Sequence, residues 1–330
     1  MATEPAGCGP EHGDKTLVVG IINNMPDSAL ESTERQFRSV LSDAYSQLPI
    51  RLRLFSLPER ERSENGRLYV ERFYEDIGSL WRTSLDGLIV TGAEPRTEHL
   101  CDERYWSTLA RVVDWAGEST TAAIWSCLAA HAAVHHLDGI ERRPFATKLS
   151  GLFECAKVGE HAIMRGIPAR WRMPHSRQYD LSEPELISRG YHILSASRAA
   201  GADIFVKHVK SLFVFVQGHP EYEPDTLMRE YRRDIRRFIA GERNEYPEIP
   251  RGYFDEETEA RFERYRDSIG MGSKDIAAAS SVPSPEGSLT FAWREVALRL
   301  YSNWLSFLCA QKNSNRGADK ASTLSAPPAA

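Results

Sequence analysis

One cysteine stands where a thiol could act as a nucleophile. Cys127 follows the apolar run at 120–126 and precedes an alanine-rich segment that predicts a helix beginning near Leu128. The helix dipole favours a thiolate at a helix N-terminus, and the backbone N–H groups there can hold an oxyanion. The competing interpretation is a core cysteine, because free cysteine is among the most buried residue types.

A second segment supplies a base for that thiol. The apolar run 211–218 ends in Gly218 and is followed by His219 and Glu221. Two residues apart after a strand, both side chains can point into one cleft, where Glu221 would orient the imidazole. A Cys–His pair with a carboxylate activates a thiol, so these residues favour a nucleophilic role for Cys127.

Several other polar residues are weaker candidates for a binding site. Lys148 could hold a carboxylate, although an isolated lysine is more often solvated. Ser176 and Arg177 are expected in a loop after a proline, where Arg177 could hold an anion or cap a turn. Arg233 lies in the basic segment RRDIRR, for which a solvated helix face is the alternative.

The histidines near Cys127 do not predict a metal site. His131, His135 and His136 have no cysteine pair or carboxylate at metal-ligand spacing, so we expect no metal. The chain has five cysteines, an odd number, and no CxxC pair. A reduced, cytoplasmic compartment is therefore favoured over a disulfide framework.

Composition narrows the class of protein. The chain has 330 residues, 26% of them charged, and a formal net charge of −5, which is typical of a globular protein and gives no electrostatic reason to bind nucleic acid. No apolar run is long enough to predict a membrane span. Residues 1–15 are polar, lack the apolar region of a signal peptide and predict a flexible leader.

The elements that would position these residues alternate between strand and helix. This alternation predicts an α/β fold with a doubly wound, mostly parallel sheet flanked by helices, and with additional C-terminal helices. The short turn between the last two strands suggests an antiparallel edge. Residues 16–308 are expected to form one domain with a loop insertion at 268–288, followed by a disordered tail at 309–330. The predicted strands are 16–22, 50–57, 86–92, 120–126, 190–197, 203–209 and 211–218, and the predicted helices are 32–44 with Thr33 as cap, 104–118, 226–240 and 291–308.

A series of motifs, taken in order, resembles a known family. They are NNMPDSALESTERQF, LDGLIVTGAEPRTEHLCDERYW, the Cys127 turn, KLSGLFE, PHSR, QGHPEYEPDTL, EYRRD, EIPRGYF and WREVALRLYSNWL. The series is similar to that of homoserine O-acyltransferases of the homoserine O-succinyltransferase type, which have a class I glutamine-amidotransferase-like fold. The resemblance covers roughly residues 16 to 308.

The resemblance implies a ping-pong acyl transfer. Cys127 would take an acyl group from acyl-CoA as a thioester, with His219 as general base supported by Glu221. Family positions matching Lys148, Ser176 and Arg233 contact the amino-acid substrate. The implied reaction acylates L-homoserine for methionine biosynthesis, with acyl-CoA as co-substrate, no bound cofactor and a homodimeric enzyme.

Other functions stay open at this point. Acylation of L-serine for cysteine biosynthesis is a close variant, because one methylene discriminates by only about 1–3 kcal/mol. A glutamine amidotransferase or glutaminase shares the fold and the Cys–His–Glu set. A non-catalytic binding protein is a further alternative, which the intact set argues against.

This chain departs from the family pattern in three places. The turn after Cys127 reads Leu-Ala-Ala-His, where Ala129 would crowd the turn and His131 replaces an amide that could reach the cleft. The first loop, at 27–32, has no lysine. The family position that discriminates acyl donors is Arg96, for which we expect pairing with the distal carboxylate of a succinyl group. The alternative is that Arg96 turns outward and Glu94 fills the pocket, which would favour acetyl-CoA.

Overall fold

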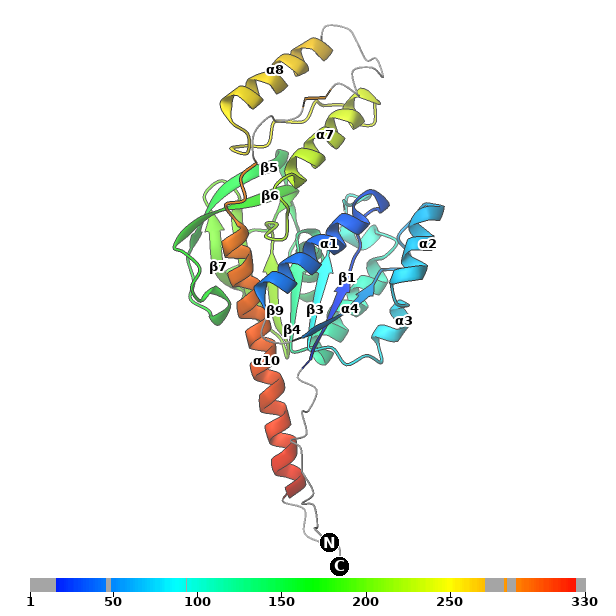
Figure 1. Ribbon diagram of the computed structural model, residues 1–330, viewed down its shortest axis with the longest axis vertical. Coiled ribbons are helices and arrows are strands. Elements are labelled where there is room, and N and C mark those ends of the chain that lie inside the picture. Colours follow the sequence, from blue (N-terminus) through cyan, green and yellow to red (C-terminus); the bar gives the residue numbers. More distant parts are fainter. Residues whose placement is uncertain (1–15, 46–48, 93, 271–281, 284–288, 325–330) are drawn as a thin grey trace, which may run out of the picture.

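A single nine-stranded sheet organises the part of the chain that the computed structural model describes, namely residues 16–45, 49–92, 94–270, 282–283 and 289–324. The strand order is β2-β1-β3-β4-β9-β8-β7-β5-β6. Four strand pairs are parallel and four antiparallel, so the sheet is mixed and consists of two halves that meet at β9 (Figure 1). The predicted α/β fold class is confirmed.

The parallel half matches the runs of apolar, partly β-branched residues in the sequence. Burial on both faces explains these runs, since a strand covered by helices on either side has no solvated face. All five residues of β3, β4 and β9 are buried. The strands are β1 (Leu17–Ile22), β2 (Ile50–Phe55), β3 (Gly87–Thr91), β4 (Ala122–Ser126) and β9 (Leu212–Val216).

The antiparallel half is larger than the sequence suggested. The predicted antiparallel pair is β8 (Gly201–His208) with β9, but this pair lies inside the sheet and not at its edge. Beyond it come β7 (His192–Ser197), β5 (Arg143–Lys157) and β6 (Arg170–Asp180). The last two were not predicted as strands, and they form the far edge of the sheet.

Helices cover both faces of the sheet. One face packs on α1 (Asp27–Ala44) and α10 (Arg294–Leu324), and the other on α4 (Trp106–Ser119) and α5 (Leu128–Asp138). Shorter helices complete the connections. They are α2 (Glu64–Phe73), α3 (Ile77–Leu80), α6 (Glu183–Ser188), and the 3-10 turns η1 (Leu100–Asp102) and η2 (Ala162–Met164).

Helix α1 begins earlier than predicted, at Asp27, so the prediction of Thr33 as its cap is wrong. Thr33 lies buried within the helix. The Asp27 carboxylate in the first turn accepts hydrogen bonds from Arg62 and from the Ser63 backbone, and a negative charge there also suits the helix dipole. The lysine-free segment 27–32 is therefore the start of a helix and not a loop.

Two helices form a lobe beyond the carboxyl ends of the parallel strands. These are α7 (Thr226–Ile239), which was predicted, and α8 (Glu256–Gly270), which was not. Figure 1 shows them at the top of the molecule, with the lower end of α7 beside β5 and β6. They share a separate apolar cluster that includes Tyr231, Phe262 and Trp293. The predicted loop 268–288 starts inside α8, and most of its remainder lies outside the described residues, as does the predicted leader at 1–15.

The last helix is longer than the predicted 291–308. Helix α10 continues to Leu324, so the predicted tail begins inside it. Its residues Trp304 and Leu308 pack against Gly87, where an added Cβ would lie 2.7 and 2.6 Å from the two side chains. Further on, Lys312 donates to the Thr16 carbonyl at 2.8 Å. Within the described residues, no helix combines the length and apolar character that crossing a membrane requires.

Candidate active site

Cys127 lies on a strained turn between β4 and α5. Its φ of 50° makes it the one non-glycine residue with a positive φ among those described. A left-handed residue at a strand-to-helix turn is the geometry of a nucleophile elbow, which presents the side chain at the carboxyl end of the sheet. The Cys127 N–H donates to the Val216 carbonyl at 2.7 Å and so fixes the turn to β9.

Gly92, at the end of β3, makes this turn possible. A Cβ at position 92 would lie 2.5 Å from the Leu128 Cβ and 2.7 and 2.8 Å from the backbone nitrogens of Leu128 and Ala129. Only glycine permits this approach. Ala129 was expected to crowd this turn, and the missing side chain at Gly92 leaves the room that the turn needs. The N–H groups of Leu128 and Ala129 belong to the first helical turn, which has no internal acceptors for them.

The predicted base and its carboxylate come together after β9. His219 Nδ1 lies 2.9 Å from Glu221 Oε1, and both side chains are buried. The imidazole stacks on Tyr222, with ring centroids 4.1 Å apart and planes at 16°. Its other nitrogen, Nε2, is buried with no hydrogen-bond partner among the described residues.

The electrostatic environment links His219 to Cys127. Burial works to lower the pKa of the His219 imidazole, but the interactions with Glu221 and Cys127 outweigh it and raise the pKa well above its usual value. An imidazolium at this position would stabilise a thiolate at Cys127. The structure thus brings together Cys127, His219 and Glu221.

The three predicted substrate contacts converge on one face of α7. Lys148 Nζ lies 2.8 Å from Asp234 Oδ2 and 3.9 Å from Glu230 Oε2. Arg233 Nε donates to Asp234 Oδ1 at 2.9 Å, and the Ser176 hydroxyl donates to Glu230. Lys148 and Arg233 are thus ion-paired and partly buried, and Ser176 lies in strand β6 and not in the predicted loop.

Glu230 joins this group to the candidate catalytic residues, and the sequence analysis missed it. The Tyr222 hydroxyl, beside His219, donates to Glu230 Oε1 at 2.8 Å. Burial favours the neutral acid, but Lys148 and Arg233 outweigh that effect and lower the pKa of the Glu230 carboxyl. Glu230 and Asp234 are the acidic pair at i and i+4 in an otherwise basic helix face, and that spacing was the available signal.

Arg177 has a structural role. Its guanidinium is buried and donates to the Tyr179 carbonyl at 2.6 Å, to Asp180 Oδ1 at 2.8 Å and to the Ala200 carbonyl. These contacts tie the end of β6 to the turn before β8. The interpretation of Arg177 as a local cap is therefore the better of the two offered by the sequence.

The two predicted donor-specificity residues pair with different partners. Arg96 forms an ion pair with Glu61, and its side chain is 58% exposed. Glu94 lies 2.8 Å from Arg237 on α7 and is also exposed. In the described part of the chain, neither side chain has a hydrogen bond or ion pair with Cys127.

The histidines of α5 each have a polar partner. His131, which stands where the family has an amide, is buried, and its Nε2 is 2.8 Å from Gln217 Oε1. Burial lowers its pKa to about 3, which keeps the ring neutral. His135 lies 3.3 Å from Glu141 Oε1, and His136 lies 2.8 Å from Asp114 Oδ1.

Fold and site together define a class of protein. A cysteine on a strand-to-helix elbow, with a His–Glu pair after the neighbouring strand of a mixed sheet, is the arrangement of class I glutamine-amidotransferase-like enzymes. The fold is similar to that of a glutamine amidotransferase from Methylobacillus flagellatus, with a TM-score of 0.50 at 14% identity over 89% of this chain and 96% of that one.

The sequence comparisons are more specific. A family model described as homoserine O-succinyltransferase matches residues 9–315. The chain is 46% identical to a homoserine O-succinyltransferase of Methylorubrum extorquens over 91% of this chain and 89% of that protein. It is also 46% identical to one from Bradyrhizobium japonicum, over 88% and 90%. The chain belongs to the homoserine O-succinyltransferase family.

Proposed function

We propose that this protein transfers a succinyl group from succinyl-CoA to the hydroxyl of L-homoserine, as an acyltransferase of methionine biosynthesis. The observation that carries the proposal is the Cys127 elbow facing a buried His219–Glu221 pair. Membership of the family and the convergence of Lys148 and Arg233 on α7 support it.

In the first half of the reaction, the Cys127 thiolate attacks the thioester carbonyl of succinyl-CoA. The negative charge that develops on the carbonyl oxygen is stabilised by backbone N–H groups at the start of α5. The CoA sulfur leaves and takes a proton from the His219 imidazolium. The products are a succinyl thioester on Cys127 and free CoA.

In the second half, the homoserine hydroxyl attacks that thioester. Neutral His219 accepts the hydroxyl proton through Nε2, while Glu221 holds Nδ1. The Cys127 thiolate is the leaving group. Lys148 and Arg233 provide cations for the acceptor carboxylate, and Glu230 provides an anion for its ammonium group.

Arg96 is the proposed contact for the distal succinyl carboxylate. Both side chains of the Arg96–Glu61 pair are more than half exposed, and exposed pairs are worth only about 0–1 kcal/mol. A substrate carboxylate can therefore replace Glu61 as the partner of Arg96 at little cost in free energy. Faster initial rates with acetyl-CoA than with succinyl-CoA would overturn this assignment and favour Glu94 as the residue that fills the pocket.

Mass spectrometry of the intact protein tests the reaction class. After incubation with succinyl-CoA and no acceptor, we expect one added succinyl group on Cys127, and its loss when L-homoserine is added. Loss on addition of L-serine alone would indicate the cysteine-biosynthesis variant. Release of ammonia from glutamine, with no succinyl adduct, would indicate a glutaminase.

A cytoplasmic homodimer is part of the proposal and is supported by membership of the family. Light scattering coupled to size-exclusion chromatography would measure the mass. A monomeric mass at micromolar protein would contradict the dimer.

A further inference from the structure

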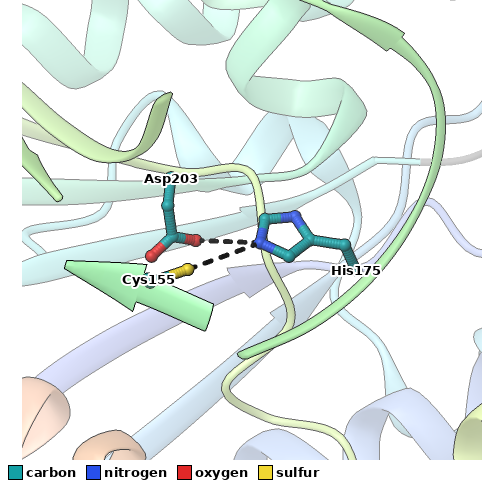
Figure 2. Close-up of side chains that lie close together, drawn as sticks. All are labelled: Cys155, His175 and Asp203. Atoms are coloured by element: carbon teal, nitrogen blue, oxygen red, sulfur yellow. Dashed lines mark hydrogen bonds and ion pairs between the residues drawn. The ribbon is translucent and has the colours of Figure 1, made fainter. Parts of the chain in front are cut away.

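Three buried side chains that the proposed mechanism does not use lie together under the catalytic loop. Cys155, His175 and Asp203 come from β5, β6 and β8, and none of them is exposed to solvent. His175 Nε2 lies 3.4 Å from Asp203 Oδ1 and 4.0 Å from Cys155 Sγ. Figure 2 shows the imidazole edge facing both the carboxylate and the thiol. We call these three residues the Asp203 cluster.

The cluster lies directly against the backbone that carries His219. A Cβ at Gly218 would lie 2.8 Å from Asp203 Oδ1 and 3.2 Å from His175 Cε1. The same backbone is bonded on both sides, since the Gln217 N–H donates to the Asp203 carbonyl and the His219 N–H to the Pro174 carbonyl, each at 2.8 Å. Residues 217–219 are therefore held between β8 and β6 at the two positions where the cluster side chains originate.

We propose that the Asp203 cluster positions the catalytic imidazole, with Asp203 as the positioning residue that fixes the Gly218–His219 backbone on the sheet. This inference rests on the proposed function for its kinetic meaning. It assigns a role to side chains that never touch substrate. A side chain at Gly218 is excluded by Asp203 together with Met173, whose Cγ would lie 2.5 Å from an added Cβ.

The charge state of the cluster is unusual for a protein core. Burial, reinforced by Arg177 and His219, lowers the pKa of His175 well below its usual value, so the ring is neutral. Burial raises the pKa of the Cys155 thiol, which stays protonated. Burial also raises the pKa of Asp203 to about 6, against the opposing effects of Ser195, Cys155 and Arg177.

At neutral pH Asp203 is therefore a buried carboxylate, which burial destabilises. The groups that face it are Cys155 from β5, His175 and Arg177 from β6, and the Ser195 hydroxyl from β7, which donates at 2.9 Å. A residue that lowers stability and lies under a catalytic loop is a candidate for a functional role. Because the folded pKa of Asp203 is above the unfolded value, this penalty is present above pH 6 and disappears as the pH falls towards 4.

The test is Asp203→Asn, which keeps the shape and removes the charge. We expect kcat to fall by roughly 10- to 100-fold, as for a small displacement of a catalytic group, with both KM values changed by less than about three-fold. Wild-type kcat should decrease as the pH falls through about 6, and this step should be missing in the variant. The melting temperature at pH 7.5 should be unchanged or higher.

A matched control separates positioning from stability. Tyr191, in the core on the other face of the sheet, donates to Asp138 at 2.6 Å, so Tyr191→Phe also removes a partly buried hydrogen bond to a carboxylate. We expect it to lower the melting temperature and leave kcat unchanged. If Asp203→Asn fails to fold, Ser195→Ala removes one bond to the same carboxylate and should reduce kcat alone, by a smaller factor.

A measurement made without substrate distinguishes failure of this inference from failure of the proposed function. The alkylation rate of Cys127 by iodoacetamide, resolved by peptide mapping, reports how well His219 supports the thiolate. We expect it to fall in Asp203→Asn even if succinyl-CoA were to give no adduct in the wild type. Unchanged alkylation and unchanged kcat would overturn the inference. One equivalent of a bound metal ion that is lost in the variant would also overturn it, since Cys155, His175 and Asp203 would then be ligands.

Discussion

The two halves of the sheet contribute differently to the candidate site. The parallel half provides Cys127, which lies on a strained turn at the end of a buried strand. The φ of Cys127 is 50°, and Gly92 leaves room for this turn. The antiparallel half and the α7 lobe provide charge, through Lys148 on β5 and Glu230 and Asp234 on α7. His219 lies at the junction, after β9. Close packing thus sets the geometry of the proposed nucleophile, and paired charges on separate elements form the proposed acceptor site.

The largest expected effect comes from substituting Cys127, the proposed nucleophile at the end of the parallel half. In Cys127→Ser we expect the acyl-transfer rate to fall by about 10⁴-fold or more, because a hydroxyl is a far weaker nucleophile and leaving group. Initial rates and the intact mass after incubation with succinyl-CoA measure this. Substantial residual turnover would show that Cys127 is not the nucleophile.

A substitution at Gly92 tests whether packing alone sets the nucleophile geometry. In Gly92→Ala we expect the rate of thioester formation to fall by about 100-fold, because the new Cβ would displace the Leu128 and Ala129 backbone. Gly117→Ala is the matched control, since a Cβ there would meet Val209 at an ordinary 3.5 Å. Equal rates for the two variants would contradict the packing argument.

Lys148, on the antiparallel half, should act only in the second half-reaction. In Lys148→Met we expect KM for the acceptor to rise by roughly 10- to 100-fold, because an ionised partner of Asp234 and of the substrate is lost. Succinyl-thioester formation should stay within about two-fold of the wild type. Arg170→Met, which removes an exposed pair with Glu154 on the same strands, is the control and should behave as the wild type.

The smallest expected effect is on the free energy of unfolding, and it comes from the His219–Glu221 pair at the junction of the two halves. The folded pKa of His219 is raised, so its contribution to stability is fully present below the unfolded value of about 6.5 and is lost as pH rises through the folded pKa. In Glu221→Gln the pKa of His219 in the folded protein falls, because its carboxylate partner is removed. We therefore expect the loss of stability to begin at lower pH. The free energy of unfolding should differ by about 1.4 kcal/mol for each unit by which the two folded pKa values differ. Urea unfolding at pH 6 to 10 measures the difference. Parallel pH profiles for the two proteins would contradict the assigned pair.

The sequence was a better guide to the parallel half than to the antiparallel half. Strands buried on both faces give continuous apolar runs, and the residue types of Cys127, His219 and Glu221 suggested one site. Strand β5 is largely exposed at its start and has an irregular register between Pro144 and Leu149, so it gave neither an apolar run nor an alternating pattern. Strand β6 contains Pro174, which suggested a loop. Proline is tolerated there because β6 is the edge of the sheet.

The sequence could not indicate which charges meet across elements. Lys148 and Asp234 are 86 residues apart, and their contact depends on how α7 returns over β5. The positions of Arg96 and Glu94 depended likewise on partners at Glu61 and Arg237. Local patterns carry no information on such pairings, since each side chain alone is compatible with a solvated surface.

The contact between Lys312 and the start of β1 has a consequence for biosynthesis. Lys312 donates to the Thr16 carbonyl and to the Asp86 carboxylate, which in turn accepts from the Val18 N–H. A ribosome synthesises β1 well before Lys312. The Thr16 carbonyl and the Asp86 carboxylate therefore lack their Lys312 partner until α10 has left the exit tunnel. Until then the nascent chain exposes an apolar sheet face, and chaperones are expected to bind it during that interval.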